Sequence, residues 1–269
     1  MAAKKILYIA QEIMPYVPEN EISKLCRQLP QAIQDRKNEV RLFMPRYGHI
    51  NERKNQLHEV IRLSGANIAI NDTDHPLILK VASIAAAHMQ VYFIDNDDLF
   101  SRKGVIGESN GEEFEDCDER MIFYIRGVIS TVKKLGWKPD VVHCVGWMSA
   151  LTPYFVKKAF ADDEFFADVK VVTSVCKDDF KQTFADGFRS KCAIDELSDD
   201  DLALVPDSAV NYEALMKFAL DFSDAAVIAQ PDCDPAIVEY AENKFGNVPV
   251  IEFADGYADK YNEFYESLF

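Results

Sequence analysis

The chain has 269 residues, 48% of them apolar, and carries a formal net charge of −16 with a pI near 4.7. It is long enough to bury one large core, and its negative charge disfavours nucleic acid and anionic membranes as partners. The six scattered cysteines form no Cys-x-x-Cys pair, which indicates reduced thiols in a cytoplasmic protein. Because the apolar runs are short, neither a signal peptide nor a membrane span is predicted.

The first predicted element is a buried strand, Ile6–Ala10, and the loop that follows it contains no glycine. Apolar residues at helical spacing then predict a helix from Ile22 to Ile33, with Asn20 as its N-cap and a kink at Pro30. A second strand is expected over Glu39–Met44.

The region 57–94 alternates β-like runs with turn residues. This pattern predicts a meandering insertion that adds hairpin strands to the edge of the sheet. The runs lie at 60–63, 68–70, 77–84 and 89–94.

The second half of the chain alternates predicted helices with predicted strands. Helices are expected at 112–135, where Gly136 ends the first of them, and at 148–160, 212–222, 235–244 and 257–268. Strands are expected at 140–144, 169–175, 225–228 and 248–253, and the segment 177–207 is irregular and acidic. This alternation predicts a single α/β domain, residues 1–269, with a doubly wound and mostly parallel sheet.

The loop after the first strand, Glu12–Glu21, lies where α/β proteins usually hold phosphates. Such loops use glycines for close approach and the positive N-terminus of the next helix. Here prolines remove backbone donors, and Glu19 and Glu21 would repel a diphosphate. The sequence therefore predicts a nucleotide site that has been closed.

Separated segments of the chain match one known family in order and spacing. They are residues 6–15, 29–33, 38–48, 91–96, 118–120, 135–144 and 217–231. These segments resemble the N-terminal domain of bacterial glycogen synthases and plant starch synthases, glycosyltransferase family 5. The resemblance implies a Rossmann-like sheet, the N-terminal half of a GT-B-type glycosyltransferase, and transfer of glucose from ADP-glucose to an α-1,4-glucan. Because the matches cover this half alone, the second, nucleotide-binding domain is expected to be absent.

The chain departs from the family at the positions that the family uses for its chemistry. Its Lys-Thr-Gly-Gly-Leu loop is replaced by Pro18, Glu19, Asn20, Glu21 and Ile22. Its His-Asp-Trp-His-Thr-Ala motif becomes Val145, Gly146, Trp147, Met148, Ser149 and Ala150, and its strand-end histidine becomes Cys176, followed by Lys177. Transfer needs basic groups or a metal to neutralise the diphosphate leaving group. Independent catalysis is therefore not expected, binding of the family donor ADP-glucose is doubtful, and neither a cofactor nor a metal is predicted.

The same resemblance suggests six residues that could bind a sugar: Glu12, Tyr16, Arg46, Tyr47, His143 and Trp147. Each also has a simpler structural interpretation. His143 could be a buried, hydrogen-bonded histidine, Trp147 could pack the core, and Arg46 with Tyr47 could cap the second strand.

Two other patterns have chemical interpretations. Cys176 beside Lys177 could be an activated thiol nucleophile, although no histidine lies near in sequence to act as its base. The carboxylates of Asp195–Asp207 could bind calcium, but they lack the glycine and the distal glutamate of a calcium loop. A solvated charge run accounts for them better.

Three functions are compatible with these observations. The first is a non-catalytic relative that binds α-glucan or an oligosaccharide through Trp147, Tyr16 and Arg46. The second is one half of a glucosyltransferase, completed by a separate nucleotide-binding chain. The third is a scaffold for a protein partner, whose cleft is filled by Pro18, Met148 and Cys176.

Overall fold

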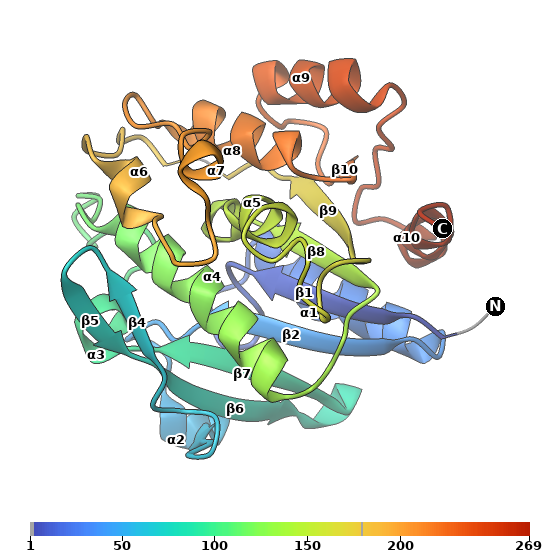
Figure 1. Ribbon diagram of the computed structural model, residues 1–269. Coiled ribbons are helices and arrows are strands. Elements are labelled where there is room, and N and C mark those ends of the chain that lie inside the picture. The colour runs from blue at the N-terminus through green and yellow to red at the C-terminus, as the bar shows by residue number, and fades with distance from the viewer. Residues whose placement is uncertain (1–2, 179) are drawn as a thin grey trace.

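The computed structural model describes residues 3–178 and 180–269, which form a sheet with helices on both faces (Figure 1). The sheet has eight strands in the order β10-β9-β8-β1-β2-β7-β6-β3. Six of them are parallel: β1 (Lys5–Ala10), β2 (Glu39–Pro45), β7 (Met89–Asp95), β8 (Val141–Val145), β9 (Lys170–Val175) and β10 (Ala225–Ile228). Strand β6 (Ile78–Ile84) and the edge strand β3 (His58–Glu59) are antiparallel to their neighbours. The predicted doubly wound, mostly parallel sheet is confirmed.

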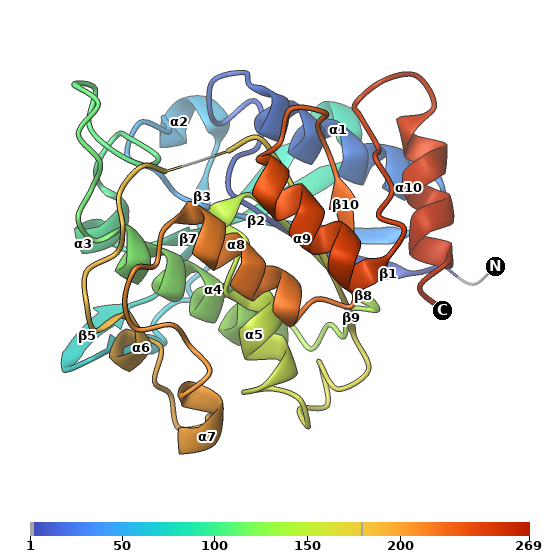
Figure 2. The same cartoon turned by 90° about the horizontal axis from the view of Figure 1, so that it is seen from above.

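Two layers of helices bury the central strands. Helices α1 (Glu21–Asp35) and α10 (Tyr257–Glu266) cover one face, and α4 (Cys117–Lys134) with α5 (Thr152–Lys157) covers the other (Figure 2). Strand β8 is buried along its whole length, as is typical of a parallel strand covered on both faces. The remaining helices are α2 (Glu52–Asn55), α3 (Asp97–Phe100), α6 (Phe188–Lys191), α7 (Asp199–Leu202), α8 (Tyr212–Asp221) and α9 (Pro235–Phe245), with single 3₁₀ turns η1 (Ala85–Ala87) and η2 (Trp147–Ser149).

The insertion at 57–94 is confirmed in outline and corrected in detail. Strands β6 and β7 form the expected antiparallel hairpin, but β7 also pairs in parallel with β2 and so belongs to the main sheet. Strands β4 (Asn67–Ile70) and β5 (Thr73–Pro76) form a separate two-stranded sheet. The strand predicted at 60–63 is wrong, because a turn forms there in which Leu63 N donates to Val60 O at 2.9 Å.

Three other predicted elements are shorter than expected. The long helix begins at Cys117, because Glu113 instead forms a β-bridge with Gly107. The helix predicted over 148–160 is reduced to η2 and α5. The strand predicted over 248–253 is reduced to a single parallel bridge between Val250 and Ile228.

Within residues 3–178 and 180–269, no helix is both long and apolar enough to cross a membrane. All six cysteines are unpaired and buried.

Candidate functional site

The carboxyl ends of the six parallel strands lie along one edge of the sheet, where α/β proteins usually bind ligands. Most of the predicted site residues follow these strands directly. Residues 12–21 follow β1, Arg46 and Tyr47 follow β2, residues 146–148 follow β8, and Cys176 and Lys177 follow β9. The topology therefore brings together segments that are far apart in the sequence.

The N-terminus of α1 is capped and negatively charged. Asn20 is the N-cap, as predicted: its Oδ1 accepts from Ser23 N at 2.7 Å, and Ser23 Oγ accepts from Asn20 N at 2.9 Å. Lys24 Nζ lies 2.9 Å from Glu19 Oε1 and 3.5 Å from Glu21 Oε1. The cap uses a backbone donor that a phosphate would need, and two carboxylates against one ammonium leave this end negative.

Glu12 is buried in the loop that leads to α1. Its Oε2 accepts a hydrogen bond from Asn20 Nδ2 at 3.1 Å. Burial raises the pKa of the Glu12 carboxyl, and the hydrogen bond from Asn20 partly opposes that shift. Pro18, in contrast, is exposed, so it does not fill the cleft in the way that the scaffold hypothesis expects.

The two tyrosines that were candidates for sugar binding are both buried. The ring of Tyr16 packs edge-on against Phe93, with centroids 4.8 Å apart. Tyr47 donates its hydroxyl hydrogen to Gln11 O at 2.9 Å. Neither ring has an exposed face on which a sugar could stack.

Arg46 belongs to an ion network at the ends of β2, β6 and β7. Its Nε lies 3.1 Å from Asp95 Oδ2, and its Nη2 lies 2.9 Å from Glu52 Oε1. Lys80 Nζ contacts the same two oxygens, at 2.8 Å and 2.7 Å respectively. The Asp95 side chain is only 1% exposed, so this network compensates a buried negative charge.

We expect Arg46→Ala to lower the free energy of unfolding by about 2 kcal/mol, because only Lys80 then neutralises the buried Asp95 carboxylate. Urea unfolding measures the change. The exposed Arg53 of α2 is the matched control, and Arg53→Ala is expected to change stability by less than about 0.5 kcal/mol. Equal effects of the two substitutions would contradict a role for Arg46 in compensating Asp95.

His143 lies inside the core and links three strands to the last helix. One ring nitrogen, Nδ1, is 2.6 Å from the Tyr265 hydroxyl, and the other, Nε2, is 2.7 Å from Ser174 Oγ. The Tyr265 hydroxyl also lies 3.0 Å from that of Tyr8. Burial lowers the pKa of His143 from 6.5 to about 3, so the ring is neutral at physiological pH. These contacts place the ring among its hydrogen-bond partners and away from the surface.

The segment after β8 is packed against the loop after β1. Val145, Trp147 and Met148 are fully buried, and Met148 N donates to Gln11 Oε1 at 3.3 Å. Trp147 packs edge-on against Phe180, with ring centroids 5.2 Å apart. Trp147 therefore packs the core and presents no free face to a sugar.

Gly146 allows this close approach. Its φ is +84°, and a Cβ at this position would lie 2.7 Å from the Gln11 Cβ. Gly111 has a similar φ of +87° but open space around it, so it provides a matched comparison.

Gly146→Ala is therefore expected to lower the free energy of unfolding by about 1–2 kcal/mol more than Gly111→Ala, because overpacking against Gln11 adds to the strain of a positive φ. Thermal unfolding of the two variants in parallel checks this difference. Equal losses would show that the contact with Gln11 relaxes without cost.

Cys176 and Lys177 do not form an activated thiol pair. The Cys176 thiol is buried, and burial raises its pKa well above the usual value, which disfavours the nucleophilic thiolate. Lys177 Nζ pairs with Asp232, and Lys177 N donates to Gln230 Oε1. A hollow of about 110 Å³ lies beside them, lined in part by Glu21, Cys176 and Gln230.

The acidic run at 199–201 forms the start of α7. Ser198 is its N-cap, and Asp201 pairs with Lys158 at 2.9 Å. In the described part of the chain, no three histidine, cysteine or acidic side chains gather as metal ligands.

A family model described as the starch synthase catalytic domain matches residues 5–244. The chain belongs to this family. The predicted resemblance is confirmed.

Relatives of the starch synthase family cover the chain in part. The glycogen synthase of Chlorobium limicola is 37% identical over 172 residues, which are 64% of this chain and 35% of the relative. That of Chlorobaculum tepidum is 36% identical over the same shares. The matched region thus spans about a third of the length of these curated relatives.

A solved structure supports the family fold. The catalytic domain of Starch Synthase IV from Arabidopsis thaliana, bound to ADP and acarbose, matches with a TM-score of 0.68 at 18% identity. The match covers 86% of this chain and 45% of that one. The large, mostly parallel sheet is therefore that of a GT-B glycosyltransferase catalytic domain.

Sequence reasoning missed the partners that enclose the candidate residues of this family member. Tyr265 and Ser174 hold His143, and Asp95 holds Arg46. Asp95 ends a strand in a segment that matches the family, and this position was a usable signal. Nothing local in the sequence indicates that Tyr265, 122 residues away, reaches His143.

Proposed function

We propose that this chain is a glycogen/starch synthase family protein that does not transfer glucose from ADP-glucose to α-1,4-glucan on its own. The observation that carries the proposal is the N-terminus of α1, where Asn20 caps the helix between Glu19 and Glu21. A diphosphate needs free backbone donors and positive potential at this place. The chain offers two carboxylates there.

The end of β9 supports the same proposal. In place of the family's histidine it has Cys176, a buried and neutral thiol. The neighbouring Lys177 is paired with Asp232. These groups give a leaving diphosphate little charge stabilisation.

We further propose that the chain binds a protein partner in the cytoplasm. Tyr16, Tyr47, His143 and Trp147 are all buried, which argues against glucan binding at the strand ends. A hollow of about 630 Å³ between β10, α9 and α10 has a mixed lining, whose apolar part includes Val250, itself 51% exposed. Exposed apolar surface of this kind is typical of interaction sites. Six unpaired cysteines support a reducing compartment.

Isothermal titration of the purified chain with ADP-glucose, and separately with a maltooligosaccharide, tests the proposal together with an assay for glucose incorporation. The glycogen synthase of Chlorobium limicola is the positive control. We expect no heat of binding on titration with ADP-glucose and no incorporation of glucose. Micromolar affinity for ADP-glucose would overturn the proposal.

Two other outcomes distinguish the alternatives. Binding of the maltooligosaccharide alone would support a retained acceptor site and contradict the preference for a protein partner. Turnover that appears only when a separate nucleotide-binding chain is added would support one half of a two-chain glucosyltransferase.

A further inference from the structure

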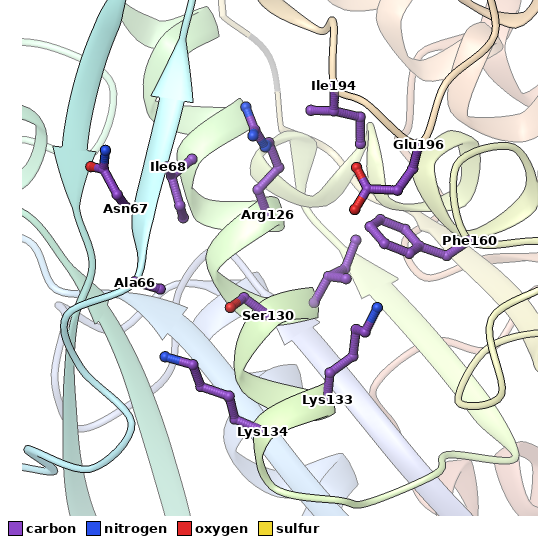
Figure 3. A pocket seen from close by; sticks show the side chains of 11 residues that line it. Ala66, Asn67, Ile68, Arg126, Ser130, Lys133, Lys134, Phe160, Ile194 and Glu196 are labelled. Carbon is purple, nitrogen blue, oxygen red and sulfur yellow. The ribbon is translucent and has the colours of Figure 1, made fainter.

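A pocket of about 340 Å³ lies over the middle of α4, and it shares no residue with the strand-end site (Figure 3). Helix α4 forms its floor, β4 forms one wall, and Phe160 with the segment 194–196 forms the other. Its volume is within the range of about 300–1,000 Å³ that is usual for small-molecule sites.

Three cations line this pocket in a chain whose net charge is −16. Arg126, Ser130, Lys133 and Lys134 have the spacing i, i+4, i+7 and i+8, which places them along one side of α4. Arg126 and Lys134 are two turns apart, about 12 Å along the helix axis. The pocket therefore has a cation at each end.

The two end cations donate to neutral groups. Arg126 Nη1 donates to Ala69 O, and Lys134 Nζ donates to Leu63 O at 3.2 Å. In the part of the chain that the structure describes, neither forms an ion pair. Lys133 differs, because its Nζ lies 2.6 Å from Asp163 Oδ2. Two positive charges are thus held in place by a backbone carbonyl of β4 and one of the turn before it, without a paired carboxylate.

The environment of Arg126 favours an added anion. Burial lowers the pKa of its guanidinium, because desolvation disfavours the charged form. Glu196, Asp195 and Cys192 act in the opposite direction, but the two carboxylates are on exposed residues and form no ion pair with Arg126. A phosphate or carboxylate group of a ligand would accept charge-assisted hydrogen bonds from this side chain.

The middle of the pocket combines apolar and hydroxyl-binding groups. The Phe160 ring lies on the wall opposite β4, and Ser130 lies on the floor between the two end cations (Figure 3). The Glu196 side chain points toward the helix from the same side as Phe160 (Figure 3). A carboxylate here accepts hydrogen bonds from hydroxyl groups, and an aromatic face packs against the carbon skeleton of a sugar.

We infer that this pocket binds a small organic molecule with an acidic group at each end and hydroxyl groups between them, of which a sugar bisphosphate is the chemical type. Arg126 and Lys134 hold the two acidic groups, and Glu196 and Ser130 bind the hydroxyls. The inference does not depend on whether the strand-end site is closed.

Isothermal titration calorimetry at low salt tests this inference, with fructose 1,6-bisphosphate, fructose 6-phosphate and inorganic phosphate as probes. The bisphosphate is expected to bind at least ten-fold more tightly than the other two. Arg126→Gln and Lys134→Gln are each expected to weaken bisphosphate binding at least ten-fold, to the level of the monophosphate. Lys54→Gln, which removes the same charge from an exposed position on α2, is the matched control and leaves affinity unchanged.

Ser130→Met blocks the pocket without changing its charge. The larger side chain fills the floor of the pocket, and no cation is removed. It is expected to abolish bisphosphate binding, with thermal unfolding run alongside to show that the variant is folded. The inference is overturned if the wild-type chain shows no saturable binding, or if inorganic phosphate binds as well as the bisphosphate. Unchanged affinity in both Arg126→Gln and Lys134→Gln also overturns it, and shows that these cations only hold the backbone of the β4 wall.

Discussion

Replacing Trp147 by alanine is expected to lower the free energy of unfolding by about 3–5 kcal/mol, the usual cost of removing a large buried aromatic side chain. Trp147 is fully buried and packs against Phe180. Trp147→Phe keeps most of this volume and is expected to cost less than half as much. Its indole nitrogen has no hydrogen-bond partner in the described residues, so the phenyl ring loses packing but no hydrogen bond.

Chemical unfolding monitored by circular dichroism measures both changes. Ile61, which is 82% exposed, is the control, and Ile61→Ala is expected to stay within about 0.5 kcal/mol of the wild type. Near-native stability of Trp147→Ala, combined with lost affinity for a maltooligosaccharide, would contradict the packing role. That result would indicate that the ring swings out to bind sugar.

Replacing His143 by leucine is expected to lower the free energy of unfolding by about 3 kcal/mol at pH 7, because it leaves the Tyr265 hydroxyl and Ser174 Oγ buried with fewer partners. His143 connects β8 with β9 and α10 through these two groups. The loss should therefore be accompanied by earlier opening of α10, which amide hydrogen exchange measures.

The pH dependence of stability provides a second readout for His143. Burial lowers the pKa of His143 to about 3 in the folded state, whereas its pKa in the unfolded state is 6.5. The unfolded state therefore binds the proton first as the pH falls. The contribution of neutral His143 to the free energy of unfolding is complete above pH 6.5. It is lost as the pH falls toward 3, with a slope of about 1.4 kcal/mol per pH unit.

Urea unfolding at pH 7, 6 and 5 measures this slope. His143→Leu is expected to remove it, and the wild type and the exposed control His58→Gln are expected to retain it. The same slope in His143→Leu as in the wild type would show that other groups cause the acid sensitivity.

Much of the fold could be predicted because it depends on local patterns. The run at Ile6–Ala10 and the helix capped by Asn20 were both predicted, since burial on both faces and capping leave clear signals in adjacent residues. Elements that depend on distant partners were less predictable. Val60–Leu63 has the composition of a strand but forms a turn, and Val250 forms only a single bridge to Ile228.

The candidate site, like the fold, could be predicted from the sequence only in part. The order of motifs placed its residues on the loops after β1, β2, β8 and β9, and the topology of a parallel sheet brought those loops to one edge. The cations of α4, Arg126, Lys133 and Lys134, were not predicted to form a site, because a helical pattern does not show what forms the opposite wall of a pocket. Phe160 and Glu196 approach that helix only in the folded chain.

The sequence by itself determined the family and the parallel α/β sheet, because both depend on residue identity and order. It also predicted that the family's basic and glycine residues are replaced at 18–22. Only the tertiary structure decided that Trp147, Tyr16 and His143 are buried and that Arg46 is committed to Asp95. Burial is a property of contacts between segments far apart in the chain, such as the hydrogen bond between His143 and Tyr265. A residue's type and its neighbours in sequence do not specify which distant side chain will cover it.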